Sequence, residues 1–186
     1  MSQRAAEQGG AGRSSAPERI VLVGFMGAGK STVGLELARL LGFRFLDMDR
    51  RIEELAGLTI ARIFELQGEA AFRAIEQRVA FELAGLRRHV VAAGGGAFAR
   101  AETRRALRSG ALTVWLQCDL ETVLGRVATG DPRPLAANRE RMAVLFAERA
   151  PSYRLADWAV DASGASAAEV ARRIWEDVMG RGSPER

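Results

Sequence analysis

The sequence predicts an α/β fold in which a five-stranded parallel sheet carries helices on both faces. Short apolar runs alternate with helical segments five times along the 186 residues, as expected of parallel strands that are buried on both sides. The first run, residues 20–23, leads directly into the glycine-rich segment Gly24–Thr32, and helical spacing follows it. We expect one domain over residues 18–180, with a disordered leader, 1–17, and a short tail, 181–186.

The first half of the chain alternates short strands with helices. The expected elements are a strand at 20–23, a helix at 33–41, a strand at 43–46, two short helices between Ile52 and Leu66 that are broken near Gly57, and a longer helix from Gly68 to about Leu86. The short second strand ends at Asp47, and Asp49 follows two residues later.

The second half continues the alternation. The expected elements are an apolar strand at 90–93, a helix at 101–109, a strand around Val114, helices at 120–127 and 137–149 with the second ending before Pro151, a strand at 158–160, and a final helix capped by Ser166. Residues 129–134 contain two prolines and a glycine, which predicts an exposed mobile loop.

Composition limits the classes of partner. The net charge of +4, without a long basic block, does not favour nucleic-acid binding. No apolar run is long enough to span a membrane. The single cysteine, Cys118, allows no internal disulfide, which fits a reducing compartment, so a cytoplasmic protein is expected. The many arginines can instead bind small anionic molecules.

The segment Gly24–Thr32 has the spacing G-x-x-x-x-G-K-[ST] of a phosphate-binding loop, between a strand and a helix as such a loop requires. The residues expected to hold ATP phosphates are Gly27, Ala28, Gly29, Lys30, Ser31 and Thr32. Lys30, the only lysine of the chain, would reach the β- and γ-phosphates, and the Ser31 hydroxyl would bind Mg²⁺. The alternative is a glycine-rich turn that binds nothing.

Acidic residues and glycines follow two further strands. Asp47 and Asp49 flank Met48, so at an extended strand end both would point the same way and could serve a metal ion and a substrate hydroxyl. The alternative is a helix N-cap. Gly94, Gly95 and Gly96 end the strand at 90–93 and would let a ligand approach the main chain closely, or form a plain tight turn. Ligands of such sheets bind beyond the carboxyl ends of the strands.

Several arginines are candidates for binding anions. Arg73 has Glu76 one helical turn away, and Arg149 lies just before Pro151. Taken alone, such residues are more often solvated surface charges. Arg126 precedes the proline-containing loop and Arg133 lies within it. A loop arginine could stabilise a transferring phosphoryl group, or remain a solvated charge.

These motifs, in this order, resemble the shikimate kinase family. The residues that carry the resemblance are Gly24–Gly34, Asp47–Asp49, Ile63–Phe64 with Gly68–Glu69, Phe72–Arg73, Glu76, Gly94–Gly96, Arg133–Leu135, and Arg149 with Pro151 and Tyr153. The resemblance implies a three-layer P-loop kinase fold that phosphorylates the 3-hydroxyl of shikimate with Mg²⁺ and ATP. It also implies a substrate-binding region at about 49–80 and a mobile lid at about 125–139.

The resemblance also implies a role for each matched position. Asp47 would lie in the outer shell of the metal held by Ser31, and Asp49 would bind the substrate hydroxyl and act as its base. The residues implied to hold shikimate are Arg73, Arg149 and the glycines 94–96, with Phe64 and Phe72 packing nearby. Arg133 would contact the transferring phosphate and Arg126 would lie near adenine. Shikimate and ATP are then the partners, and a monomer is expected.

Two other functions remain open from the sequence. A kinase of another small polyol acid, such as gluconate, would need the same carboxylate-binding arginines. A regulatory nucleotide-binding module would keep the phosphate loop but have little use for Asp49 or Arg133. The loop 161–165 after the last strand has no basic residue, whereas family members often carry one over adenine, so recognition of the base there would rest on backbone groups.

Overall fold

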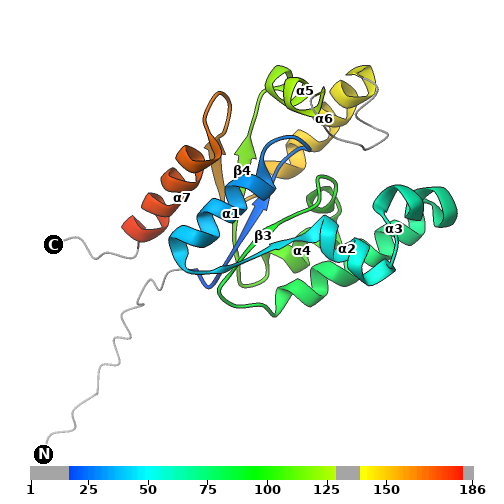
Figure 1. The fold of residues 1–186 in the computed structure, drawn as a ribbon, viewed down its shortest axis with the longest axis horizontal. Helices are drawn as coiled ribbons and strands as arrows, with labels where there is room; N and C mark the ends of the chain where they lie inside the picture. Colours follow the sequence, from blue (N-terminus) through cyan, green and yellow to red (C-terminus); the bar gives the residue numbers. More distant parts are fainter. Residues whose placement is uncertain (1–16, 129–138, 182–186) are drawn as a thin grey trace, which may run out of the picture.

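The computed structural model describes residues 17–128 and 139–181 (Figure 1). Most of the predicted leader, the loop containing Arg133 and the end of the tail lie outside the described residues. The expected lid at 125–139 is described only at its two ends, where α5 (Leu120–Ala128) stops and α6 (Arg139–Tyr153) begins.

The centre of the fold is a five-stranded sheet in the order β2-β3-β1-β4-β5. The strands are β1 Arg19–Val23, β2 Arg44–Asp47, β3 His89–Ala92, β4 Leu112–Gln117 and β5 Trp158–Asp161. Every neighbouring pair is parallel. All carboxyl ends therefore lie at one edge, and the predicted fold class is confirmed.

Helices cover both faces of this sheet, as predicted (Figure 1). The remaining elements are α1 Lys30–Leu41, α2 Met48–Ala56, α3 Ile60–Ala84, the 3₁₀ turn η1 Ala97–Ala99, α4 Ala101–Arg108 and α7 Ala167–Arg181. Helices α1 and α7 pack side by side against one core, which receives Ile20 and Leu22 of β1. Val21 and Val23 point to the opposite core, shared with α2, α3 and α4, because successive side chains of a strand alternate between faces.

Two local predictions need correction, whereas the predicted boundary at Gly68 is confirmed: its φ of 80° and ψ of 175° are non-helical, and two helical stretches meet there within α3. Asp49 does not lie on an extended strand end, because α2 begins at Met48 and Asp47 is its N-cap. Helix α6 runs through Pro151 to Tyr153, so the predicted stop at Arg149 is wrong. Pro151 lies in the last turn of α6, where the missing N–H weakens only the end of the helix.

A buried arginine joins the ends of two helices to the start of the sheet. Arg19, 2% exposed, donates from Nη1 to the carbonyl oxygens of Leu83 (2.7 Å), Leu86 and Ala84, and from Nη2 to that of Ser109. Burial lowers the pKa of this guanidinium. Leu83 and Ala84 end α3, Leu86 lies just after it, and Ser109 directly follows α4. The carbonyls therefore lie where helix acceptors run out of intrahelical partners. Arg19 therefore fixes both helices relative to β1.

Candidate active site

The phosphate loop leaves the carboxyl end of β1 and ends where α1 begins at Lys30. Gly27 and Gly29 adopt φ of 75° and 90°, conformations that favour glycine, so the chain can curl ahead of the helix. The Lys30 ammonium donates to the carbonyl oxygens of Gly24 (3.0 Å) and Phe25 (2.9 Å). The loop therefore surrounds one cation next to the N–H groups of a helix start, an arrangement suited to phosphate.

Ser31 and Asp47 meet across two neighbouring elements. The Ser31 hydroxyl donates to Asp47 Oδ2 at 2.5 Å. The other oxygen, Oδ1, accepts from the backbone N–H groups of Asp49 (3.0 Å) and Arg50 (3.4 Å). Asp47 is thus the N-cap considered from the sequence and also a partner of the phosphate loop, while its role toward a metal ion stays a prediction.

A first pocket opens beside the phosphate loop, between α1, α5 and the loop after β5. Its lining residues are Ala28, Gly29, Thr32, Val33, Arg126, Ala162, Ala165, Ala167 and Val170. Arg126 crosses it, donating from Nη2 to the Ala162 carbonyl (3.2 Å) and from Nη1 to that of Gly27 (3.5 Å). Cys118 lies 3.7 Å from Arg126 Nη1. It is half-buried, and burial raises its thiol pKa. The structure thus places Arg126 in the pocket beside the phosphate loop, and its position near adenine stays a prediction.

A second pocket lies on the other side of β1. Its lining residues are Met26, Asp49, Ile60, Phe64, Phe72, Arg73, Glu76, Gly95, Gly96 and Arg149. Seven of these were predicted from the sequence to meet at a substrate site, although they come from four separate parts of the chain. Met26, Ile60 and Glu76 were not predicted to line it. Apolar residues in a loop and at a helix start carry no chemical signal, and Glu76 was considered only as a partner of Arg73 one helical turn away.

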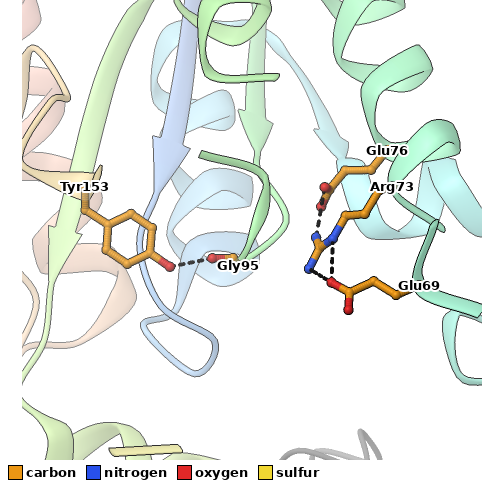
Figure 2. Close-up of polar contacts among 5 residues, drawn as sticks. All are labelled: Glu69, Arg73, Glu76, Gly95 and Tyr153. Atoms are coloured by element: carbon orange, nitrogen blue, oxygen red, sulfur yellow. Dashed lines mark hydrogen bonds and ion pairs between the residues drawn. The ribbon is translucent and has the colours of Figure 1, made fainter. Parts of the chain in front are cut away.

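Arg73 is held from two sides by carboxylates (Figure 2). Its Nη1 donates to Glu76 Oε2 at 2.9 Å, and its Nε and Nη2 donate to Glu69 Oε1 at 3.1 and 3.0 Å. Glu76 is 1% exposed, so this is not the surface pair that spacing alone suggested. Burial raises the pKa of Glu76, and the attraction to Arg73 lowers it less. Burial lowers the pKa of Arg73, but its ion pairs with Glu76 and Glu69 make the net shift upward.

The three glycines after β3 lie against the charged groups of this pocket. A Cβ added at Gly94 would stand 2.7 Å from Asp49 Oδ1 and 3.5 Å from Glu76 Oε1. One added at Gly96 would stand 3.0 Å from Arg73 Nη1 and 3.5 Å from Arg149 Nη2. Side chains of the protein therefore approach the backbone of these glycines closely, and the approach of a ligand stays a prediction. Both arginine forks therefore converge on one point above Gly96.

Aromatic rings support these charges. The Arg149 guanidinium lies 5.8 Å from the centroid of the Phe25 ring, and that of Arg73 lies 5.0 Å from the Phe72 ring. Phe72 in turn packs on Phe64 with ring centroids 4.7 Å apart. Such contacts favour a cation over the ring face and leave the outer edge of the fork for a ligand. The pocket can grip an anion while presenting the Asp49 carboxylate nearby.

Together, the sheet order, the phosphate loop and the neighbouring anion-binding pocket define a P-loop kinase that acts on a small molecule. The comparisons with known proteins give the family. The family model described as shikimate kinase matches residues 26–179, and the chain belongs to the shikimate kinase family.

Relatives match over most of their length. The chain is 46% identical to shikimate kinase of Moorella thermoacetica, covering 86% of this chain and 94% of that relative. It is 46% identical to that of Halorhodospira halophila, covering 90% and 97%. A solved structure of shikimate kinase from Acinetobacter baumannii in complex with shikimate has a TM-score of 0.84 and 38% identity, covering 88% of this chain and 93% of that one. A gluconokinase from Sinorhizobium meliloti, 21% identical with a TM-score of 0.56, shares the fold alone.

No helix within 17–128 and 139–181 is long and apolar enough to cross a membrane. No group of three or more His, Cys, Asp or Glu side chains in the same ranges is arranged to hold a metal ion.

Proposed function

We propose that the pocket between Arg73 and Arg149 binds the carboxylate of shikimate and that Asp49 receives the hydroxyl to be phosphorylated. The reaction of this family member is the ATP-dependent phosphorylation of the 3-hydroxyl of shikimate, which gives shikimate 3-phosphate and ADP in the pathway to chorismate and aromatic amino acids. The observation that carries the assignment is the convergence of both guanidinium groups on Gly96, in the pocket that Asp49 also lines.

The two arginines suit a carboxylate because each guanidinium presents a planar fork of donors that matches the two oxygens. Arg73 is already oriented by Glu69 and Glu76, so little conformational freedom remains to be lost when substrate binds. Asp49 lies behind Gly94 at the same side of the pocket. A carboxylate there can accept the hydroxyl proton as the new O–P bond forms, or orient the hydroxyl for attack.

On the donor side, we assign the phosphates of ATP to the backbone of residues 27–32 and to Lys30. The ammonium now bound to loop carbonyls would turn toward the β- and γ-phosphates, whose charge exceeds that of the two carbonyl dipoles. The pocket crossed by Arg126 is assigned to adenine. Arg133, outside the described residues, is proposed as the arginine that contacts the transferring phosphoryl group.

The hydroxyl of Ser31 and the carboxylate of Asp47 fit a magnesium ion. Both are oxygen donors, 2.5 Å apart, beside the loop assigned to phosphate, and Mg²⁺ prefers such ligands together with water and phosphate oxygens. We propose that Ser31 is a direct ligand and that Asp47 acts through bound water. The bound ion would neutralise charge on the transferring phosphate.

We also propose that the enzyme acts as a monomer in the cytoplasm. Asp49, Arg73, Gly96 and Arg149 all come from a single chain, so the proposed acceptor pocket needs no second copy. Light scattering of the purified enzyme, with and without substrates, would test the first part.

The experiment that tests the function is a coupled ADP-release assay with Mg-ATP and either shikimate, gluconate or no acceptor. We expect turnover only with shikimate. Turnover with gluconate would support a kinase activity but contradict shikimate as the substrate. ATP binding without turnover on either acid would instead support the regulatory module that the sequence left open.

A further inference from the structure

The glycines after β3 form a β-turn that could exist in two states. The Ala97 N–H donates to the Gly94 carbonyl oxygen at 3.0 Å, which closes a turn with Gly95 and Gly96 at its centre. Gly96 has φ −101° and ψ −11°, the third position of a type I turn. A type II turn would need φ of about +80° at the same position, which only glycine adopts readily. With glycine at both central positions, neither turn type is excluded by side-chain sterics.

The two turn types differ in the direction of their central peptide. Interconversion turns the plane of the Gly95–Gly96 peptide over while the ends of the turn stay in place. Because C=O and N–H point in opposite directions in a trans peptide, the turn would exchange the Gly96 N–H for the Gly95 oxygen. No cis peptide bond occurs among the described residues, so this geometry applies here.

Tyr153, the only tyrosine of the chain, contacts this peptide directly. Its hydroxyl donates a hydrogen bond to the Gly95 carbonyl oxygen (Figure 2). The side chain is 2% exposed, and burial raises the pKa of its hydroxyl to about 12. The hydroxyl is therefore protonated, and able to donate, at every pH at which the enzyme is expected to work.

The bond orients the peptide with respect to the acceptor pocket. Figure 2 draws Tyr153 and Arg73 on opposite sides of the Gly95 segment. With the Gly95 oxygen held toward Tyr153, the Gly96 N–H points away from Tyr153, and Gly96 itself lines the pocket beside both guanidinium groups. In the flipped peptide a carbonyl oxygen would replace this N–H, and it would repel a bound carboxylate.

Tyr153 also connects the turn to the helix that carries Arg149. The two residues lie four positions apart on α6, and residues at this spacing share one helix face. The ring of Tyr153 packs near Trp115 of β4, with centroids 6.1 Å apart, which fixes its position from below. Tyr153 therefore joins the turn to the face of α6 that carries Arg149.

We propose that Tyr153 is a positioning residue for substrate binding, which locks the Gly95–Gly96 peptide in the orientation that presents an N–H to an anionic acceptor. This inference rests on the proposed function, in which that pocket binds shikimate. It assigns Tyr153 no contact with substrate.

The test is Tyr153→Phe, which keeps the ring and removes the hydroxyl. We expect the KM for shikimate to rise by about 3- to 10-fold, the weight of one neutral hydrogen bond, with little change in kcat or in the KM for ATP. In ¹⁵N-labelled enzyme we expect exchange broadening of the Gly96 amide in the variant only, measured by relaxation dispersion, which detects motion in the microsecond-to-millisecond range.

Thr113→Val is the matched control. Its hydroxyl is also buried, and it donates to Asp157 Oδ2 at 2.6 Å at the start of β4, the opposite edge of the sheet from the pocket. We expect it to lower the melting temperature while leaving the shikimate KM and the Gly96 amide unchanged.

Two results would overturn the proposal: an unchanged shikimate KM with a sharp Gly96 amide in Tyr153→Phe, or an equal rise in both KM values that Thr113→Val reproduces. If the wild type fails to turn over shikimate, the proposed function fails. The proposed role of Tyr153 is then tested by the Gly96 amide signal alone: broadening in Tyr153→Phe supports it, and a sharp signal refutes it.

Discussion

Glu76 Oε2 accepts a hydrogen bond from Arg73 Nη1 at 2.9 Å, although the glutamate side chain is almost sealed from solvent. Glu69 holds the same guanidinium from the exposed side, so the fork has one buried and one solvated partner. Breaking a buried pair leaves an uncompensated charge, so the two residues should act as one unit. The orientation of Arg73 then depends on the ionisation of Glu76.

This dependence predicts a pH effect on substrate binding. Burial raises the pKa of Glu76, so it takes up a proton at a higher pH than an ordinary glutamate. The neutral acid holds Arg73 less firmly, so we expect the shikimate KM to rise as the pH falls through this raised value. Measuring kcat/KM for shikimate from pH 5 upward checks this.

Glu76→Gln serves as the neutral reference for that titration. We expect its shikimate KM to be high already at neutral pH and to lack the acid dependence of the wild type. The free energy of unfolding also depends on the protonation of Glu76. The pKa of Glu76 is higher in the folded protein than in the unfolded chain. Its contribution to stability is therefore complete below the ordinary glutamate pKa and is lost as the pH rises through the pKa of the folded protein. An identical acid limb in Glu76→Gln would contradict this account.

Removing Arg73 or Arg149, the two arginines assigned to the carboxylate of shikimate, should weaken shikimate binding. For Arg73→Ala and Arg149→Ala we expect the shikimate KM to rise by orders of magnitude, corresponding to about 2–5 kcal/mol for each lost charge partner. Arg62→Ala is the control, since Arg62 lies in the part of α3 before Gly68 and forms an exposed pair with Glu65. Steady-state kinetics with varied shikimate measures the effect. An unchanged shikimate KM in both Arg73→Ala and Arg149→Ala would contradict the assignment of these arginines to the carboxylate.

Asp49→Asn tests the role of the acceptor-side carboxylate. We expect kcat to fall by about 10²- to 10⁴-fold, the usual contribution of a general base, with an unaltered melting temperature. Asp177→Asn, on the exposed face of α7, should leave kcat unchanged. Near-normal turnover in Asp49→Asn would exclude a role as base and leave only orientation of the hydroxyl.

Arg19 provides a prediction about stability alone. Arg19→Met keeps the apolar stem but removes the guanidinium donor from the part-buried carbonyl oxygens of Ala84 and Ser109 at the ends of α3 and α4. We expect a loss of about 2–4 kcal/mol in the free energy of unfolding, given the cost of unsatisfied buried acceptors. Urea titration measures it, with Arg39→Met as control because the Arg39 side chain is 79% exposed. Activity per folded molecule should be unchanged in both.

The sequence predicted best what depends on local pattern. The phosphate loop, the alternation of strand and helix, and the grouping of Asp47 and Gly94 at strand ends follow from spacing and from the shared edge of a parallel sheet. The cap at Ser166 was also confirmed, since its hydroxyl accepts from the Glu169 N–H while Glu169 accepts from the Ser166 N–H. These features need no knowledge of how distant segments pack.

What could not be predicted depends on tertiary packing. The i, i+3 spacing of Arg73 and Glu76 is the same for a surface pair and for a buried one, and only the docking of α3 decides between them. In the sequence, Arg19 is an arginine at the start of a strand, and no local pattern indicates which carbonyl groups it binds. Pro151 suggested an early end to α6 and so hid the helical position of Tyr153.

The order of the strands also separates the two substrates. Groups assigned to ATP come from α1, α5 and the loop after β5, whereas groups assigned to the acceptor come largely from α2, α3 and the turn after β3. Helix α6 adds Arg149 to the second set. β1 runs between the two halves and is shared by both. A kinase built this way can exchange its acceptor half for another without a change in the nucleotide site. Residues 48–84 are therefore the segment in which a new acceptor specificity could be engineered.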